Sequence, residues 1–560
     1  MQIKKHLLFF ALFVFIQAGF AWSVEKPLVF SKENPVIPSA YRNFLSSKPP
    51  TEKVRVWVYF TDKGVFDQDS YARARKMTEN LFTSKSLQRR AKSIKGELTS
   101  FIDLPVQHSY VESIKILGAD LRQISRWLNA ASFEVSINKL DQISILPFVK
   151  SIQPVLTYIR QPLKEEIQPE LKPVESLDYG PSYSQLQQIN VPAVHTLGYK
   201  GQGVLVCMMD TGFRKDHIAF KTAYQEGRVL AEYDFINHDT NTQNEPGQDA
   251  SDQHNHGTYT WSALGGEIDG SLYGPAYKAN FILAKTEYVP TETRIEEDNW
   301  VAGMEWADSL GADVISSSLG YLNFDNGFTY TKQQLDGKTA VTTIAANTAS
   351  RLGIVVCNAM GNEGPGDTTL ITPADAETIL ACGAVNSSGT IASFSSRGPT
   401  GDGRIKPEVV ARGVSTYCAT ATDTNTFGYV GGTSLSTPLV GGCAAVLLSA
   451  HPYWNPWMVR EALIRTANNS NSPNNTYGWG LINLLAALQY SFGFDTGDVN
   501  QDGKVSISDA VYLINYLFKG GPPPNLLYRG DMNCDQSITV GDVVYLINYL
   551  FKGGPPPCSY

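Results

Sequence analysis

The chain has 560 residues, too many for one compact domain, and its hydrophobic content of 42% is ample for several cores. Residues 1–180 carry a net charge of +7 and residues 181–560 a net charge of −15, which together give the formal net charge of −8. The negative charge of residues 181–560 gives no electrostatic reason to expect nucleic acid or an anionic membrane surface as a partner. It suits a protein that binds calcium.

The first 21 residues have the pattern of a secretory signal peptide. Lys4 and Lys5 precede an apolar stretch at residues 7–20, and Ala21 follows with small residues at the positions that a signal peptidase recognises. The alternative, a membrane-anchoring helix, needs about 20 apolar residues, and this stretch is shorter. We expect residues 1–21 to be removed and the mature protein to be secreted and extracellular, with the periplasm or the cell surface as alternatives and no membrane span.

Residues 22–152 are expected to form a small α+β domain. The alternation of apolar and polar residues over 54–60 predicts a half-buried strand, and a polar, mostly helical stretch follows to about residue 115. The remaining pattern is strand, strand, helix and strand, at residues 116–121, 132–137, 138–146 and 148–152.

Residues 153–180 are expected to be a linker. They contain four prolines and several charges without apolar periodicity. Cutting the chain here would separate the basic portion from the acidic one.

Residues 181–490 are expected to form an α/β domain with a largely parallel sheet and helices on both faces. Short apolar runs alternate with helical stretches such as residues 299–310 and 336–352. Loops at the carboxyl ends of the strands would then carry the chemistry. The predicted strands cover residues 204–209, 281–285, 313–317, 353–357 and 379–385.

A serine between a glycine turn and a buried helix is the candidate nucleophile. Ser434 precedes residues 439–449, which are apolar nearly all round, as expected of a helix buried on every side. The N–H groups in the first turn of such a helix can face a developing oxyanion. Pro438 is expected among these first-turn positions, where its missing N–H removes no helical hydrogen bond. The alternative is that Ser434 only caps the helix.

Three other polar groups accompany this serine. Asp210 ends an apolar run, His256 opens a run of small and apolar residues, and Asn362 stands between glycines after a predicted strand. These four sites resemble the motifs of the subtilase family of serine peptidases, in the family's order. The motifs are Asp-Thr-Gly at 210–212, His-Gly-Thr at 256–258, Gly-Asn-Glu-Gly at 361–364 and Gly-Thr-Ser-x-x-x-Pro at 432–438.

The resemblance implies a subtilisin-like fold and an Asp210-His256-Ser434 triad, with Asn362 stabilising the tetrahedral oxyanion. It implies that residues 22–152 are a propeptide, which assists folding, inhibits its own enzyme and is then cut off. An N-terminal domain that stays attached is the alternative. The Ser-Leu-Gly segment implies that Ser318, Leu319 and Gly320 bind the substrate backbone as an added strand.

Residues 495–560 contain a tandem repeat with a spacing of 33 residues. Each copy has a 12-residue loop in which side-chain oxygens at positions 1, 3, 5, 9 and 12 and a backbone carbonyl at position 7 can surround calcium. A predicted helix with an identical sequence follows each loop. The predicted ligands are Asp498, Asn500, Asp502, Lys504, Ser506 and Asp509 in the first loop and Asp531, Asn533, Asp535, Ser537, Thr539 and Asp542 in the second.

The duplicated loop and helix resemble a type I dockerin, which implies a small helical calcium-binding module and a cohesin-like partner. Positions 10 and 11 of the loops, at 507–508 and 540–541, lack the Ser-Thr pair that many dockerins use, which leaves the cohesin partner open. Gln536 replaces the glycine that favours the sharp turn, which would weaken the second site. Cys534 and Cys558 can close the module with a disulfide, whereas the other five cysteines are expected to be buried thiols.

The sequence thus predicts a secreted serine endopeptidase that is made as a self-processing zymogen and hydrolyses peptide bonds in protein substrates through an acyl-enzyme intermediate. Calcium is the expected cofactor, in the C-terminal repeat and with the peptidase domain as a second location. The alternative is an inactive protease-like scaffold or binding protein that docks through its C-terminal repeat.

Overall fold

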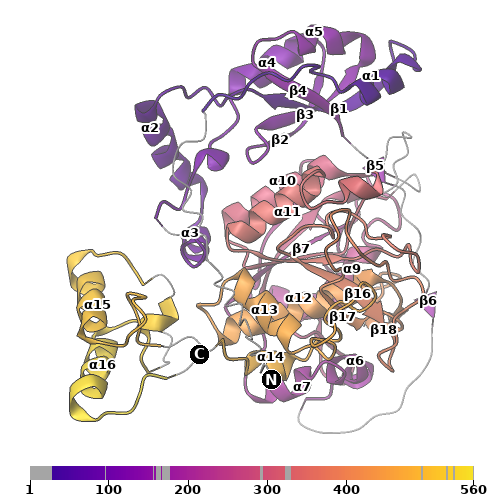
Figure 1. Ribbon diagram of the computed structural model, residues 1–560. Coiled ribbons are helices and arrows are strands. Elements are labelled where there is room, and N and C mark those ends of the chain that lie inside the picture. Colours follow the sequence, from indigo (N-terminus) through magenta and orange to yellow (C-terminus); the bar gives the residue numbers. More distant parts are fainter. Residues whose placement is uncertain are drawn as a thin grey trace, which may run out of the picture.

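The computed structural model describes residues 28–94, 96–155, 157–158, 165–166, 177–289, 294–321, 330–492, 496–524, 527–533 and 537–558. Three folded parts follow one another along the chain: a small domain with a sheet, a large α/β domain and a pair of helices (Figure 1). The expected signal peptide and most of the expected linker lie outside the described residues.

The small N-terminal domain is an antiparallel sheet with helices on one face. The strand order is β2-β3-β1-β4, and helices α1, α4 and α5 lie above the sheet (Figure 1). Val56 and Val58 point into the core of this domain, whereas Trp57 packs against the large domain. The elements are α1 (Ser39–Ser46), β1 (Lys53–Phe60), α4 (His108–Ile116), β2 (Asp120–Ser125), β3 (Ala130–Ser136), α5 (Leu140–Ser144) and β4 (Val149–Pro154).

The strand expected at residues 116–121 was wrong. Helix α4 ends at Ile116, and Gly118 then adopts a left-handed φ of +90°, the conformation in which glycine commonly ends a helix. Strand β2 begins only at Asp120. The apolar residues at 116 and 117 lie at the end of helix α4 and not at the beginning of the strand.

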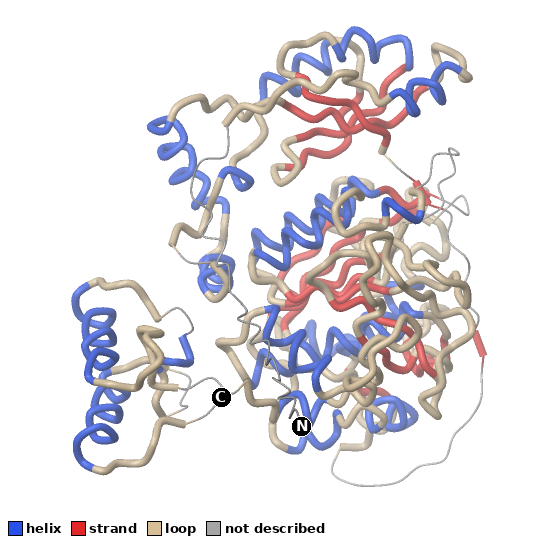
Figure 2. Tube along the Cα trace, in the orientation of Figure 1, coloured by secondary structure: helices blue, strands red, loops and turns tan. Residues whose placement is uncertain are grey.

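The large domain is built on a sheet of seven parallel strands in the order β17-β16-β15-β14-β7-β11-β8. Figure 2 shows this sheet between layers of helices, which confirms the predicted α/β fold. The strands are β7 (Leu205–Asp210), β8 (Val229–Asp234), β11 (Asn280–Lys285), β14 (Val314–Ser317), β15 (Val355–Ala359), β16 (Leu380–Val385) and β17 (Val409–Arg412).

Helices cover both faces of the sheet, and β8 at its edge is partly exposed. Helices α10 (Glu297–Leu310) and α11 (Val341–Arg351) cover one face, and α9 (Asn255–Gly265), α12 (Thr433–Ala450) and α13 (Pro456–Arg465) cover the other. Alternate residues of β7 belong to the two cores: Val206 and Met208 to the one on the α12 side, and Cys207 and Met209 to the other. This explains why β7 is an unbroken apolar run.

Helix α12 begins earlier than the sequence suggested. It starts at Thr433, so Pro438 lies in its second turn and the expected first-turn position was wrong. Within the described part of the chain, α12 is the one helix long and apolar enough to cross a membrane, and 94% of it is buried inside the protein.

Short elements complete the large domain. Two of them come from the expected linker: β5 (Thr157–Tyr158) pairs with β13 (Arg294–Glu296), and β6 (Glu165–Glu166) pairs with β19 (Phe427–Val430). The others include α6 (Tyr183–Gln187), α7 (Val191–Thr196), α8 (Lys221–Gln225), β9 (Glu267–Ile268), β10 (Leu272–Tyr273), β12 (Glu287–Tyr288), β18 (Thr416–Ala419) and α14 (Leu484–Leu488).

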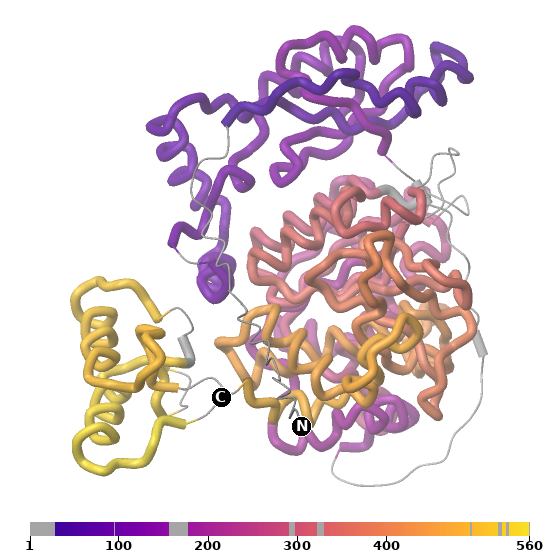
Figure 3. Tube along the Cα trace, in the orientation of Figure 1, coloured from indigo at the N-terminus to yellow at the C-terminus, as the bar shows by residue number. Residues whose placement is uncertain are grey.

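The C-terminal part is a pair of equal helices, coloured yellow in Figure 3. Helices α15 (Ile507–Lys519) and α16 (Val540–Lys552) each have 13 residues. Both end at a glycine with a φ of +67°. Their shared core includes Leu513 from the first helix and Leu546 from the second, so the sequence repeat becomes a structural repeat.

Removing the ring of Trp261 should destabilise the large domain. Trp261 is fully buried and stacks on Phe220 with ring centroids 3.7 Å apart. We expect Trp261→Ala to lower the free energy of unfolding by about 3–5 kcal/mol. Denaturant unfolding in a Ser434→Ala background measures this change. The control, Trp457→Ala, removes an exposed ring and should cost about 0.5 kcal/mol or less; equal effects of the two variants would contradict the packing argument.

Candidate active site

Asp210 lies at the carboxyl end of β7 and faces a histidine. Its Oδ1 atom is 2.6 Å from Nδ1 of His256 and also accepts a hydrogen bond from the Thr211 N–H at 2.8 Å. Asp210 and His256 are only 1% and 5% exposed. A carboxylate in this position holds the imidazole in one orientation and stabilises its charged form.

Helix α9 delivers His256 from its first turn. Gly257 allows this turn to approach β7 closely, because a Cβ atom at position 257 would lie 2.1 Å from the Gly212 carbonyl oxygen. Burial lowers the pKa of the neighbouring His254 to about 4. His254 therefore stays neutral at pH 7, and it does not compete as a proton carrier.

Thr260 is a residue that the sequence analysis missed. Its hydroxyl donates to Oδ2 of Asp210 at 2.9 Å, so both carboxylate oxygens are held. The signal was available, because residues 256 and 260 are four apart on one helix and such residues share a face.

Ser434 is the second residue of α12 and is 4% exposed. Its hydroxyl donates to the Ser318 carbonyl oxygen at 3.3 Å, and the Ser318 hydroxyl donates to the Ser434 carbonyl oxygen at 2.8 Å. The second bond follows from Pro438, which has no N–H for the helical partner four residues earlier. Ser318 thus supplies the donor that the proline lacks.

Asn362 lies beside the first turn of α12. Its Oδ1 atom accepts hydrogen bonds from the N–H of Thr433 at 2.9 Å and from the Thr433 hydroxyl at 3.1 Å. Because the amide oxygen is held on this side, the NH₂ group of Asn362 is directed away from Thr433. This arrangement is suited to donating a hydrogen bond next to Ser434.

The predicted substrate segment continues directly from β14. Leu319 turns its carbonyl oxygen inward, where it accepts from Nδ2 of Asn358 at 2.9 Å. The Ser318 carbonyl is reached by the Ser434 hydroxyl, as described above. The Leu319 carbonyl is thus occupied within the protein, whereas the Ser318 carbonyl faces Ser434.

The first C-terminal loop has the form of a cation-binding loop. Asp498 accepts hydrogen bonds from the N–H groups of Asp502 and Gly503, and Asp509 accepts from those of Asn500 and Ser506. These bonds orient both carboxylates within the loop. The loop also supplies oxygens from Asn500, Asp502 and Ser506, and the Lys504 carbonyl; Gly503 has a φ of +86°, as the sharp turn requires.

The second loop repeats part of this pattern. Asp542 accepts from the N–H groups of Met532 and Thr539 at 2.7 and 2.8 Å, and Asp531 is fully buried. Asn533, Ser537 and Thr539 are among the described residues, whereas the predicted ligand Asp535 and the substituted turn residue Gln536 lie outside them. In the described ranges, no cluster of three His, Cys, Asp or Glu side chains could hold a metal ion. Calcium would therefore need amide, hydroxyl and carbonyl oxygens of the loops in addition to the aspartate carboxylates.

Five buried cysteines form no disulfide, which confirms the expected thiols: Cys207, Cys357, Cys382, Cys418 and Cys443. Burial raises the pKa of Cys357 and Cys443, so both remain protonated and are poor nucleophiles. Cys558 is disulfide-bonded, and Cys534, its expected partner, lies outside the described residues.

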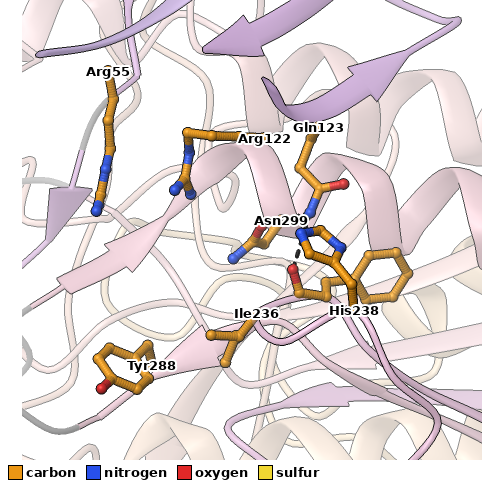
Figure 4. Close-up of a pocket in the computed structure, with 8 residues that line it drawn as sticks. Arg55, Arg122, Gln123, Ile236, His238, Tyr288 and Asn299 are labelled. Carbon is orange, nitrogen blue, oxygen red and sulfur yellow. Dashed lines mark hydrogen bonds between the residues drawn. The ribbon is translucent and has the colours of Figure 1, made fainter. Parts of the chain in front are cut away.

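A separate cavity lies where the small N-terminal domain meets the large domain (Figure 4). Arg55, Arg122 and Gln123 reach it from the small domain, and Gln123 donates to Oδ1 of Asn299 at 2.9 Å. None of the four candidate catalytic residues lines this cavity. We therefore treat it as part of the domain interface.

Comparison with known proteins identifies the class of this chain. Residues 201–480 match the subtilase family, residues 55–170 match the peptidase S8 propeptide domain of Bacteroidota, and residues 496–553 match the dockerin type I domain. The chain belongs to the subtilase family.

Individual relatives agree. Over 318 residues, 56% of this chain, it is 36% identical to subtilisin E of Bacillus subtilis (strain 168), covering 72% of that protein, and to the subtilisin of Bacillus pumilus, covering all of it. It is 29% identical over 313 residues to the serine protease AprX of Bacillus subtilis (strain 168), covering 50% of this chain and 65% of the relative. The protein is a subtilisin-like serine endopeptidase with a propeptide and a dockerin.

The exchange of hydrogen bonds between Ser318 and Ser434 gives a stability prediction. Ser318→Ala should lower the free energy of unfolding by about 1–3 kcal/mol, because it leaves the buried Ser434 carbonyl without its donor. In a Pro438→Ala background the cost should shrink, since an alanine N–H can bond that carbonyl. Denaturant unfolding of the four proteins measures the coupling; equal costs in both backgrounds would contradict this explanation.

Proposed function

We propose that the chain hydrolyses peptide bonds by nucleophilic catalysis with Asp210, His256 and Ser434 as the triad. The single observation that carries the proposal is the 2.6 Å contact between Asp210 and His256, which orients the base that the serine requires. His256 takes the Ser434 proton as the hydroxyl attacks the substrate carbonyl, and then passes it to the leaving amine. Water hydrolyses the resulting acyl-enzyme through the same groups.

We propose that Asn362 and the N–H of Ser434 bind the oxyanion. The negative charge develops at the N-terminus of α12, where the first N–H groups have no helical partner. The hydrogen bonds from Thr433 fix the amide of Asn362 in advance of the reaction, so little reorganisation is needed.

We propose that substrates bind as an extended strand along Ser318, Leu319 and Gly320. Backbone recognition reads little of the side-chain sequence, so protein and peptide substrates of broad sequence are expected. In the resting protein the Ser434 hydroxyl donates to the Ser318 carbonyl. A substrate N–H that takes this carbonyl would release the hydroxyl toward His256.

We propose that the protein is secreted as a zymogen. Residues 1–21 would be removed as a signal peptide, residues 22–152 would inhibit the enzyme, and maturation would cut within residues 153–180, ahead of a peptidase domain at 181–490. The pairing of β5 and β6 with the large domain supports the inhibitory role, because β6 joins β19 just before Ser434 in the chain.

We propose that residues 495–560 bind calcium and dock the enzyme to a cohesin-like partner. The donor set is all oxygen and includes the oriented carboxylates of Asp498 and Asp509, which fits a hard cation. Calcium would supply positive charge that holds each loop closed at the start of its helix.

Maturation of the purified precursor tests the catalytic proposal. We expect the wild-type protein to shed a piece that ends within residues 153–180 and then to digest casein, whereas Ser434→Ala should do neither, because losing this nucleophile costs about 10⁶-fold in kcat in subtilisin. Mass spectrometry and casein hydrolysis measure the two events. Ser436→Ala removes a neighbouring buried hydroxyl that bonds the Thr433 carbonyl and should mature normally; maturation of Ser434→Ala would refute the proposal.

Calcium titration tests the docking module. In the full chain carrying Ser434→Ala, calorimetry after chelation should show two sites, and Asp498→Ala should abolish the first because a carboxylate ligand is lost. Lys504→Ala is the matched control, since position 504 offers only its backbone carbonyl and should keep calcium. No calcium uptake by the parent, or equal losses in both variants, would contradict the ligand assignment.

A further inference from the structure

An arm of the propeptide leaves its own domain and reaches the large domain. It lies between β1 and α4 and contains α2 (Gln68–Thr78), η1 (Glu79–Leu81), α3 (Ser84–Ala91) and η2 (Phe101–Asp103). In Figure 1, α3 lies well away from the propeptide sheet. We call residues 79–94 and 96–103 of this arm the clamp. It packs against the C-terminal end of α10.

Donors of the clamp occupy the last carbonyl groups of α10. The Ser86 hydroxyl donates to the Asp308 carbonyl at 2.6 Å. The N–H of Thr83 donates to the Ser309 carbonyl at 3.0 Å, and its hydroxyl donates to the Leu310 carbonyl at 3.0 Å. The final carbonyls of a helix have no partner within it. The propeptide therefore caps a helix of the peptidase.

Arg89 inserts a guanidinium group among acceptors of the peptidase. Nη1 donates to the Ala312 carbonyl at 2.8 Å, Nε donates to the Leu352 carbonyl at 3.3 Å, and Nη2 contacts the carboxylate of Asp308. Arg89 is 2% exposed and Asp308 is fully buried. Nearly every polar atom of this guanidinium is thus matched by a group of the mature enzyme.

Two further arginines from the propeptide meet the same carboxylate. Oδ2 of Asp308 lies 2.5 Å from Nη2 of Arg90 and 3.0 Å from Nη2 of Arg126. Arg90 also pairs with Asp103 of the clamp at 2.9 Å. The ring of Phe82 covers both guanidinium groups, with distances of 4.2 and 5.0 Å from the ring centroid. The ring therefore shields both guanidinium groups from much of the solvent.

The charges explain why α10 needs this contact. The last turn of α10 has no basic residue and contains Asp308. A carboxylate at the C-terminal end of a helix opposes the helix dipole, and a buried carboxylate without a cation is costly. Arg89, Arg90 and Arg126 supply the missing positive charge, and all three belong to the propeptide.

We propose that the clamp is a second anchor of the propeptide, one that holds it on the peptidase independently of the tail that passes the active site. Cutting the linker breaks the covalent connection but leaves the arginine cluster and the helix cap intact. The clamp then slows the release of the cut propeptide. This inference rests on the propeptide assignment of residues 55–170 and not on the catalytic mechanism.

The test uses the full precursor with Ser434→Ala, so that self-processing plays no part. A recognition sequence for a sequence-specific endopeptidase is placed within residues 167–176, the linker is cut, and release of a fluorescently labelled propeptide from immobilised peptidase is followed in time. With Arg89→Ala and Arg90→Ala together, we expect release at least about 100-fold faster than with the intact clamp, because a buried carboxylate loses two cations. Arg73→Ala is the matched control: Arg73 is an exposed arginine of α2, and its loss should change the rate less than about twofold.

A milder pair of variants keeps the test decisive if the double arginine variant does not fold. Ser86→Ala removes one buried hydrogen bond to α10 and should speed release about tenfold. Ser113→Ala removes an exposed hydroxyl of α4 that bonds only within its own helix, and should leave the rate unchanged. Release rates within twofold of the intact protein for Ser86→Ala, or for the double variant when it folds, would overturn the proposal.

Discussion

The parallel order of β7, β14 and β15 is the constraint on which the candidate active site depends. These three strands are neighbours in the sheet; Asp210 is the last residue of β7, and Ser318 and Asn362 follow the carboxyl ends of β14 and β15. Neighbouring parallel strands end at the same edge of a sheet. The order of the strands alone therefore brings residues more than 150 positions apart in the chain to one edge. Helices α9 and α12 pack on the face of the same sheet and bring His256 and Ser434 to that edge. The placement of the candidate catalytic residues therefore depends on the register of buried strands that consist almost entirely of apolar residues.

The propeptide contacts the peptidase at both ends of helix α10. Near its beginning, α10 receives Arg122 and Ser132 of the propeptide on Asp298 at 3.0 and 2.7 Å. At its other end, the clamp supplies the helix cap and the countercharges of Asp308. Helix α10 packs on β7 and β11, so a contact that orders this helix also orders the strand that delivers Asp210. The contacts at both ends of α10 thus connect the propeptide to the strand on which the candidate active site depends.

Local patterns made much of this structure predictable. Five strands of the large sheet are buried apolar runs and were located to within about two residues. Strands β8 and β17 were not predicted, because β8 is partly exposed at the edge of the sheet and β17 is only four residues long. The predicted calcium-binding loops rest on two copies of one pattern in register. Contacts that link distant parts of the sequence were not predictable. Arg89 and Arg90 lie in a stretch that is polar and helical by sequence, and their partner Asp308 is more than 200 residues away. Pro438 lies in the second turn of α12 and not the first, and its missing N–H is replaced by the hydroxyl of Ser318, more than 100 residues away. The strand expected at 116–121 was wrong because Gly118, in a left-handed conformation, ends helix α4 there and β2 begins only at Asp120.

Covalent labelling of the nucleophile tests the central claim most directly. The protein and its His256→Ala variant are both cut in the linker by an added endopeptidase and freed of the propeptide. They are then treated with a phosphonylating reagent that reacts with activated serines, and the adduct is located by peptide mass spectrometry. The proposed triad predicts one adduct, on Ser434, that is lost when His256 is replaced by alanine, since an unassisted serine hydroxyl is a poor nucleophile. An adduct on a different serine, or equal labelling with and without His256, would contradict it.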